Sequence, residues 1–315
     1  MQDLAELNGC TLLRSLEIRK PYCDNAKQRN KINSLDGIEN LEKLEELVFE
    51  NVELQSTNAF SGMKSLKTIL LQDNDSLTEF IPPIHAEKLE TLNLSGCPNL
   101  SKIGDGNFGS NLSLYIENTG FTRFPAFNGV IKLENLYASN CEKMENLSGF
   151  EKISFVDDDN RIQLDGCTRL NNLDGISHLK DVELTLDTVE LPSIKTPNGI
   201  KSLRATELKS LDGIAQFSEL VKLDINSSKV TKLNGLEDLK NLKVLNLSRI
   251  SKLKSLKGLE GILSLEQLRL IDMENLEDIS AIENLPLRSI YIRGCKKKKS
   301  DFPLKLQNVI DWQSS

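Results

Sequence analysis

The sequence is poor in aromatic side chains. Aromatic residues make up 5% of its 315 residues, and only one of them is tryptophan. Apolar residues nevertheless reach 39%, the share of an ordinary folded protein. Leucine supplies much of that share, so we expect a core built mainly from aliphatic side chains. An intrinsically disordered chain is excluded by the same composition.

Long apolar runs are also missing. No stretch reaches the roughly 20 apolar residues that a membrane-spanning helix needs, so we expect no membrane insertion. The first residues lack the charged segment and apolar run of a secretory signal peptide. We therefore expect a cytoplasmic protein, with delivery into a host cell by a non-classical route as the other setting.

Positive charge is in deficit. The chain carries 39 Lys and Arg against 46 Asp and Glu, a net charge of −7. This balance opposes general affinity for phosphate backbones, so we expect no nucleic-acid partner. The four lysines at 296–299 have a nuclear-targeting interpretation. In so acidic a chain we interpret them as a solvated turn.

What the sequence does contain is a repeat. Leu220, Leu223 and Ile225 follow the pattern L-x-x-L-x-L, and further copies begin at Leu242 and Leu265, at offsets of 22 and 23 residues. Offsets of about 20 to 29 residues with this pattern are typical of leucine-rich repeats. The chain resembles that family along nearly its whole length. The resemblance implies an α/β repeat solenoid, a horseshoe whose concave face is a parallel sheet of about 13 strands.

The repeat spacing also predicts the domain organisation. Residues 1–12 read as a partial repeat or thin N-terminal cap, and residues 13–295 as leucine-rich repeats with insertions near 19–31 and 153–160. The acidic run Asp157–Asp159 lies in the second insertion. We interpret it as a solvated bulge and not as a calcium site, because no matching acidic set recurs nearby. Residues 296–315 are expected to cap the last repeat, since their apolar side chains are too many for a free tail: Phe302, Leu304, Leu306, Val309, Ile310 and Trp312.

The segments between the strands are short. They read SLDGIENL, NLDGISHL, SLDGIAQF, KLNGLEDL and SLKGLEGI, with a glycine that permits a tight turn. About 22 residues per repeat leave little room for a full helix, so we expect short 3-10 or irregular turns on the convex side. These segments resemble the subclass that includes the internalins and the leucine-rich regulatory subunit of protein phosphatase one. The repeats that contain cysteine are more similar to plant receptor and F-box repeats.

Four of the six cysteines share one repeat position. Cys97, Cys141, Cys167 and Cys295 each stand three residues after the last strand aliphatic. In the family that this chain resembles, the position is Asn or Cys, and its side chain satisfies backbone groups in the turn that leaves the strand. We therefore expect structural thiols and no metal site, since Cys10 and Cys23 lack a C-x-x-C neighbour as well.

Side chains alternate along a strand, so the residue between the second and third aliphatic of each repeat should face solvent on the concave side. These residues form one central row: Glu17, Val48, Leu70, Asn93, Tyr115, Tyr137, Gln163, Thr185, Arg204, Asp224, Asn246, Arg269 and Tyr291. Adjacent tyrosines are expected to stack, with Val48 and Leu70 as apolar neighbours that face water. Tyrosine is often an interface anchor. We therefore expect a partner-binding face that includes Val48, Leu70, Asn93, Tyr115, Tyr137, Gln163, Arg204, Arg269, Tyr291 and Arg293.

No catalytic constellation is apparent in the sequence. His85 and His178 fall in distant repeats, which excludes a Cys-His or Ser-His pair in ordinary roles. No phosphate-binding loop stands between a strand and a helix, and Gly104, Gly106 and Gly109 read as a turn. We expect neither enzymatic activity nor a cofactor.

These observations favour a non-catalytic module that binds another protein on its concave face. It would act as an adaptor, or as an inhibitor or regulator of an enzyme, and would be monomeric on its own. A bacterial effector or effector regulator is one setting. The alternatives are a receptor-like module for peptide or carbohydrate, and a structural repeat segment of a longer protein.

Overall fold

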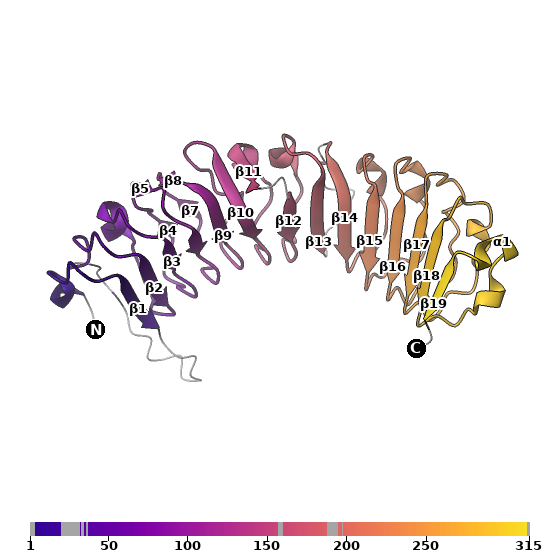
Figure 1. Cartoon of the computed structure of the whole chain (residues 1–315), viewed down its shortest axis with the longest axis horizontal. Coiled ribbons are helices and arrows are strands. Elements are labelled where there is room, and N and C mark those ends of the chain that lie inside the picture. Colours follow the sequence, from indigo (N-terminus) through magenta and orange to yellow (C-terminus); the bar gives the residue numbers. More distant parts are fainter. Residues whose placement is uncertain are drawn as a thin grey trace. The chain divides into compact units, whose positions relative to one another are not determined.

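The computed structural model describes residues 4–19, 32, 35, 37–156, 160–187, 195–196 and 198–313. The insertion near 19–31 and the acidic run 157–159 therefore lie almost entirely outside the described residues. The chain forms two compact units, residues 1–164 and 165–315, which we term the first and the second unit. Each unit is a coil of repeats with a parallel sheet along one side (Figure 1).

The sheet of the first unit is parallel throughout, with neighbouring strands supplied by successive repeats. Its path runs through β1 (Ser15–Arg19), β2 (Glu46–Glu50), β3 (Thr68–Leu70), β6 (Thr91–Asn93), β9 (Ser110–Tyr115), β10 (Ile131–Tyr137) and β12 (Arg161–Leu164). Two small strand pairs lie outside this sheet: β4 (Glu79–Phe80) with β7 (Lys102–Ile103), and β5 (His85–Ala86) with β8 (Asn107–Phe108).

The second insertion forms a strand of its own. Part of it, β11 (Ile153–Phe155), pairs with the first half of β10, at Ile131 to Leu133. The next strand in the path, β12, pairs with β10 only at Tyr137, opposite Gln163. On this side of β10, residues Glu134 to Leu136 therefore lie after the segment paired with β11 and before the residue paired with β12.

The second unit repeats the same plan. Its path runs through β13 (Val182–Asp187), β14 (Ile200–Thr206), β15 (Lys222–Asn226), β16 (Val244–Ser248), β17 (Gln267–Ile271), β18 (Ser289–Arg293) and β19 (Ile310–Gln313). The short helix α1 (Leu304–Gln307) precedes β19. Within the segment 296–315, which the sequence predicted to cap the last repeat, β19 pairs in parallel with β18. Phe302, Leu306 and Ile310 are buried as expected, but Leu304 is 83% exposed, so its predicted burial is wrong.

The L-x-x-L-x-L pattern builds the core as predicted. On β15, Leu223 and Ile225 are fully buried, and the residues that alternate with them are half-buried. Short 3-10 helices connect the strands, also as predicted: Ala5–Leu7, Asn58–Gly62, Phe150–Lys152, Asp174–Ile176, Ile214–Gln216, Leu236–Asp238, Ser280–Ile282 and Lys299–Asp301. Gly235 precedes one of them with φ of 96°, a conformation that side chains disfavour.

A left-handed residue recurs just after the strands, two positions beyond the last inner aliphatic. In the first unit it is Asn51, Asp73, Gly96, Asn118 or Asn140, with φ between 51° and 73°. Gly, Asn and Asp tolerate this conformation best. The backbone N–H of Asn51 and of Asp73 each donates to a carbonyl oxygen of the following repeat, at 3.0 Å. These bonds continue the strand ladder into the turn.

Candidate functional site

The sheet of each unit has a core face and an opposite face, which we call the open face. The central row of this open face has the order that the sequence predicts. In the first unit the registered residues are Glu17, Val48, Leu70, Asn93, Tyr115, Tyr137 and Gln163. In the second unit they are Thr185, Arg204, Asp224, Asn246, Arg269 and Tyr291, followed by Asp311 of β19. The sequence reading missed Asp311 because β19 departs from the repeat pattern.

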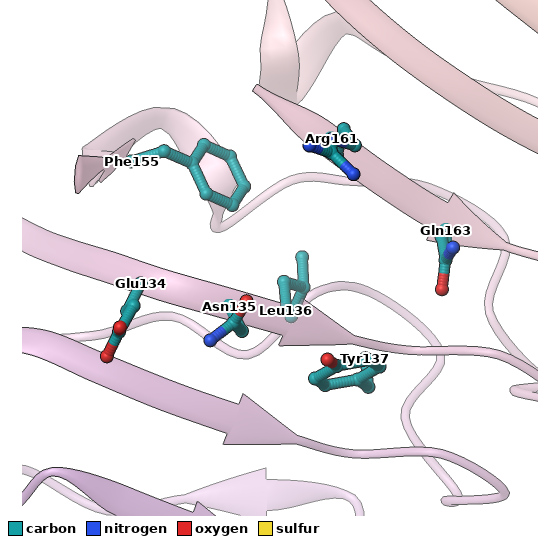
Figure 2. A pocket seen from close by; sticks show the side chains of 7 residues that line it. All are labelled: Glu134, Asn135, Leu136, Tyr137, Phe155, Arg161 and Gln163. Carbon is teal, nitrogen blue, oxygen red and sulfur yellow. The ribbon is translucent and has the colours of Figure 1, made fainter. Parts of the chain in front are cut away.

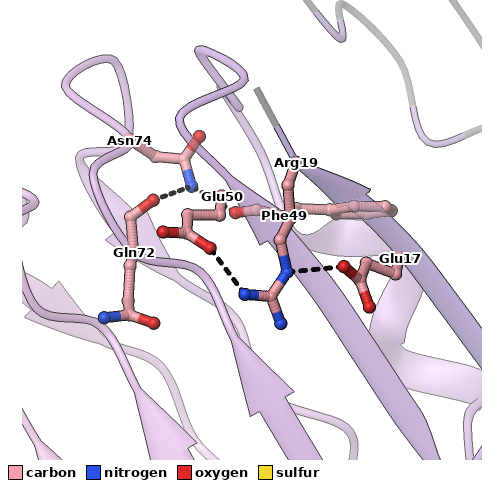
Figure 3. A network of polar contacts seen from close by, with 6 residues as sticks. All are labelled: Glu17, Arg19, Phe49, Glu50, Gln72 and Asn74. Carbon is pink, nitrogen blue, oxygen red and sulfur yellow. Dashed lines mark hydrogen bonds and ion pairs between the residues drawn. The ribbon is translucent and has the colours of Figure 1, made fainter. Parts of the chain in front are cut away.

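Val48 is not exposed to solvent, although the alternation predicted that it would be. Its side chain is fully buried, and that of Leu70 is half-buried. The positions beside Val48 hold an ion-pair network (Figure 3). Arg19 contacts Glu17 at 2.7 Å and Glu50 at 3.1 Å, joining β1 to β2 around the position of Val48. Alternation assigns the face of the strand and does not show whether neighbouring side chains cover a residue on it.

Tyr115 and Tyr137 stack as predicted. Their ring centroids are 4.5 Å apart and the ring planes are inclined by 9°. Both side chains remain half-buried, so part of each ring is open to solvent. Burial raises the pKa of Tyr115 above its ordinary value, and the neighbouring Tyr137, Glu117 and Glu134 raise it further. Tyr115 is therefore neutral near pH 7, and the stacked pair presents a flat, partly apolar surface with two hydroxyl groups.

A cavity of about 200 Å³ opens beside Tyr137 (Figure 2). It occupies the place where β10 passes from its pairing with β11 to its pairing with β12. Its lining combines two rings with polar and charged groups: Glu134, Asn135, Leu136, Tyr137, Phe155, Arg161 and Gln163. The sequence predicted Tyr137 and Gln163 here. It did not predict Phe155 and Arg161, because the insertion 153–160, which contains Phe155 and directly precedes Arg161, breaks the repeat spacing.

Polar side chains flank the tyrosine pair. Asn93 precedes Tyr115 in the row, and its Oδ1 accepts a hydrogen bond from the Ser95 backbone N–H at 2.9 Å. Gln163 follows Tyr137 and is exposed. Both residues lie where the sequence predicts, so aromatic surface is bordered by amide groups. A hydrophobic centre with a polar border is the usual composition of a protein interface.

The predicted residues of the second unit gather around another cavity. Arg204 pairs with Asp224 at 3.6 Å, and the guanidinium of Arg269 lies 4.9 Å from the ring centroid of Tyr291. Arg293 is exposed at the end of β18. The first two pairs border a groove of about 560 Å³ on the open face, formed by strands β14 to β19.

The cysteines hold the turns, as the sequence predicted. The thiol of Cys97 donates to the carbonyl oxygen of Leu71 at 3.2 Å, and that of Cys141 to Ile116 at 3.1 Å. Burial raises the pKa of Cys97 to about 12, so this thiol is protonated and unreactive near pH 7. Within the described ranges, no three His, Cys, Asp or Glu side chains are grouped so that they could hold a metal ion.

The histidines lie away from the open-face rows. His85 lies on β5, outside the main sheet, where its Nδ1 is 3.3 Å from the carboxylate of Glu87. His178 follows the 3-10 helix 174–176 of the second unit. Gly106 and Gly109 permit close backbone packing, since a Cβ on them would lie 2.6 Å from Pro82 and 2.1 Å from the Glu87 carbonyl oxygen. These glycines therefore have a packing role in the fold.

Comparison with known proteins agrees with this architecture. Residues 210–304 match the family model of the leucine-rich-repeat domain of endo-beta-N-acetylglucosaminidase EndoS. With the inner aliphatics, the parallel strands and the repeated turns described above, this match identifies the chain as a leucine-rich-repeat protein. No curated protein sequence matches it.

Several solved structures are similar in fold. The leucine-rich-repeat protein LIC12759 of Leptospira interrogans is 17% identical, over 99% of this chain and 93% of that one, with a TM-score of 0.37. An internalin, InlF of Listeria monocytogenes, is 16% identical over 98% and 88%, with a TM-score of 0.35. The ectodomain of the Arabidopsis thaliana receptor kinase GASSHO1/SCHENGEN3, solved with CASPARIAN STRIP INTEGRITY FACTOR 2, is 16% identical over 82% and 40%, with a TM-score of 0.25.

In the described part of the chain, no helix has the length and apolar character that crossing a bilayer requires.

Proposed function

We propose that the chain is a non-catalytic module that binds a partner protein on the open face of its sheet, as an adaptor or as an inhibitor or regulator of an enzyme. The observation that carries this proposal is the stacked pair of Tyr115 and Tyr137 beside an open cavity. The two rings pack against each other from paired strands, which restricts their rotamers before binding and lowers the side-chain entropy lost on binding.

The chemistry of this surface suits a protein partner. Tyrosine rings bury a large apolar area while their hydroxyl groups keep a hydrogen-bond partner, and such residues dominate interface energetics. The cavity beside Tyr137 is of the size of one side chain and could receive an anchor residue of the partner. Leu70, Asn93 and Gln163 extend the surface along the row. A cytoplasmic setting, and a role as a bacterial effector or effector regulator, belong to this proposal.

The proposal is tested by photo-crosslinking from the cell that contains the protein. The photoreactive amino acid p-benzoylphenylalanine replaces Tyr137 in one variant and Val130 in the control. Val130 is 78% exposed and lies outside the central row. We expect a protein crosslinked from Tyr137, identified by mass spectrometry, and no such product from Val130.

A second pair of variants checks the energetics. Tyr115→Ala combined with Tyr137→Ala should lower the affinity for the identified partner at least tenfold, because each removes a stacked ring. Val130→Ala combined with Leu263→Ala, which trims two exposed apolar side chains elsewhere, should change it less than twofold. Equal binding by both double variants, or crosslinking from Val130 alone, would refute the placement on the open face.

A further inference from the structure

We infer that the groove on the open face of the second unit binds an acidic peptide segment, with Arg269 and Lys222 as the residues that recognise its carboxylates. This inference rests on the proposed function and adds the chemistry of one part of the partner. It concerns the groove of about 560 Å³ between β14 and β19.

The groove carries a surplus of positive charge. Three basic and two acidic side chains line it: Arg204, Lys222 and Arg269, with Asp224 and Asp311. Arg204 and Asp224 neutralise each other at 3.6 Å. In the part of the chain that the structure describes, neither Lys222 nor Arg269 forms an ion pair, which leaves two cations against Asp311 alone.

Arg269 is oriented for binding a carboxylate. Its guanidinium lies over the ring of Tyr291 at 4.9 Å, and Tyr291 is fixed by the pairing of β17 with β18. Stacking occupies the face of a guanidinium and leaves the in-plane N–H groups able to donate two parallel hydrogen bonds to one carboxylate. The tyrosine thus restricts the arginine before any ligand arrives, which lowers the entropy cost of binding.

The spacing of the two cations suits an extended peptide. Lys222 is on β15 and Arg269 on β17, so two strand spacings of about 4.8 Å place their strands roughly 10 Å apart. Lys222 is in register with Gln267, two residues before Arg269, which adds an offset of about 6.6 Å along the strands and brings the separation to roughly 12 Å. An extended chain advances about 3.3 Å per residue and its side chains alternate in direction. Acidic residues four positions apart therefore project to the same side, span roughly 13 Å and would meet both cations. Gln267, two residues before Arg269 on β17, is exposed and offers its amide group to the peptide backbone. Asn246 lies between the two cations on β16 and lines the same groove, with its Oδ1 buried.

The same groove is poorly suited to nucleic acid. A polyphosphate would place a negative charge beside Asp224 and Asp311 at every step, and the net charge of the chain is −7. An acidic peptide carries separated charges and backbone groups, which match the mixture of cations and amides. We therefore assign the groove to a protein ligand.

The test uses the full chain and a fluorescein-labelled peptide, Gly-Glu-Gly-Gly-Gly-Glu-Gly, with binding followed by fluorescence anisotropy at low salt. A twin peptide with glutamine in place of both glutamates measures binding without charge. Arg269→Gln should weaken binding of the glutamate peptide about tenfold, since a bidentate charged contact is lost. Asp311→Asn should strengthen it about twofold to threefold by removing a like charge.

The matched control is Arg288→Gln. It removes the same charge from a residue directly before β18. Arg288 lies outside the groove and pairs with Glu266 at 3.4 Å. Its affinity should stay within twofold of the parent. Tyr291→Leu keeps Arg269 but removes its platform, and should weaken binding about threefold, so the result does not depend on one variant. Circular dichroism of each variant confirms that the fold is retained.

Three outcomes would overturn the inference. The glutamine peptide could bind as tightly as the glutamate peptide, Arg288→Gln could weaken binding as much as Arg269→Gln, or a single-stranded oligothymidine could bind in preference to the peptide. If any of these occurs while the crosslinked partner still depends on the two tyrosines, the acidic-peptide assignment fails and the proposed function stands. If only the dependence on the tyrosines is lost, the proposed function fails and the groove still binds acidic peptide.

Discussion

Asn74 is a buried polar residue of the first unit whose side chain contacts five backbone groups, and its removal tests how neighbouring repeats are held together. Its side chain is fully buried, three residues after Leu71, the inner aliphatic that directly follows β3. Its Oδ1 accepts hydrogen bonds from the backbone N–H groups of Val52 and Leu54, at 3.2 and 3.1 Å. Its Nδ2 donates to the carbonyl oxygens of Phe49 and Gln72, at 2.7 and 3.2 Å (Figure 3). The same Nδ2 lies 2.9 Å from the carbonyl oxygen of Leu71.

The expected cost of Asn74→Ala follows from these contacts. Alanine would leave the N–H groups of Val52 and Leu54 without an acceptor, and each buried unpaired N–H costs about 1–3 kcal/mol. The carbonyl oxygens suffer less, because Leu71 still accepts the thiol of Cys97. We therefore expect a loss of about 3 kcal/mol in the free energy of unfolding.

The assay is urea unfolding monitored by circular dichroism, with amide hydrogen exchange at Val52 and Leu54 as the local readout. Ile250 occupies the equivalent repeat position in the second unit and is fully buried, so Ile250→Val is the matched control, with an expected cost of about 1 kcal/mol. If Asn74→Ala cost no more than Ile250→Val, or exchange at the two amides stayed slow, the hydrogen bonds would not be what fixes this turn.

Three further predictions concern single groups. Because the pKa of Tyr115 is raised, the stability that its neutral form supplies should be present below the ordinary tyrosine pKa of about 10 and be lost as the pH rises through the raised value. In Tyr137→Phe, absorbance titration should show a lower pKa for Tyr115. An unchanged titration curve would contradict an electrostatic effect of Tyr137 on Tyr115. The pKa of Asp278 is lowered to about 2, chiefly by hydrogen bonds from Ser280 and Ser255, so the stabilisation that its carboxylate supplies should be present above pH 4 and be lost toward pH 2. Asp278→Asn should therefore unfold at a lower urea concentration than the parent at pH 6. At pH 2 the two proteins should unfold at the same urea concentration. Gly149→Ala should lower the free energy of unfolding more than Gly129→Ala does, by about 1 kcal/mol or more, as measured by urea unfolding. Both glycines have positive φ, but only at Gly149 would a Cβ meet a backbone oxygen, at 2.4 Å. Equal losses would show that φ alone determines the cost.

The sequence pattern predicts most of the fold because the repeat constrains it twice. The inner aliphatics decide which side of each strand is buried, and their fixed spacing decides which residues lie opposite each other. The order of the open-face row within each unit followed from these two facts, and so did the stacking of Tyr115 on Tyr137. The structural role of Cys97 and Cys141 followed from their position in the turn.

What the sequence did not predict lies where the repeat is interrupted. The second insertion places Phe155 and Arg161 at the cavity, because β11 pairs with a strand that already has a partner further along. Val48 was expected to face water and is buried, since alternation carries no information on cover from neighbouring side chains. The groove of the second unit includes Asp311, from a strand without the leucine pattern. The left-handed turn residues were missed because Asn, Asp, Gly, Glu, Ser and Arg share that position.

The alternation of each strand divides the chain into two independently variable sets of residues. On β17, Leu268 and Leu270 belong to the interior, whereas Gln267, Arg269 and Ile271 can change without a cost to the interior. Selection could therefore exchange one partner for another while the scaffold stays the same. A single-residue insertion within such a strand would do the opposite, because it would turn the leucines to solvent and the arginine inward. Substitutions should accordingly accumulate on the open face among related chains, and insertions should be confined to the turns.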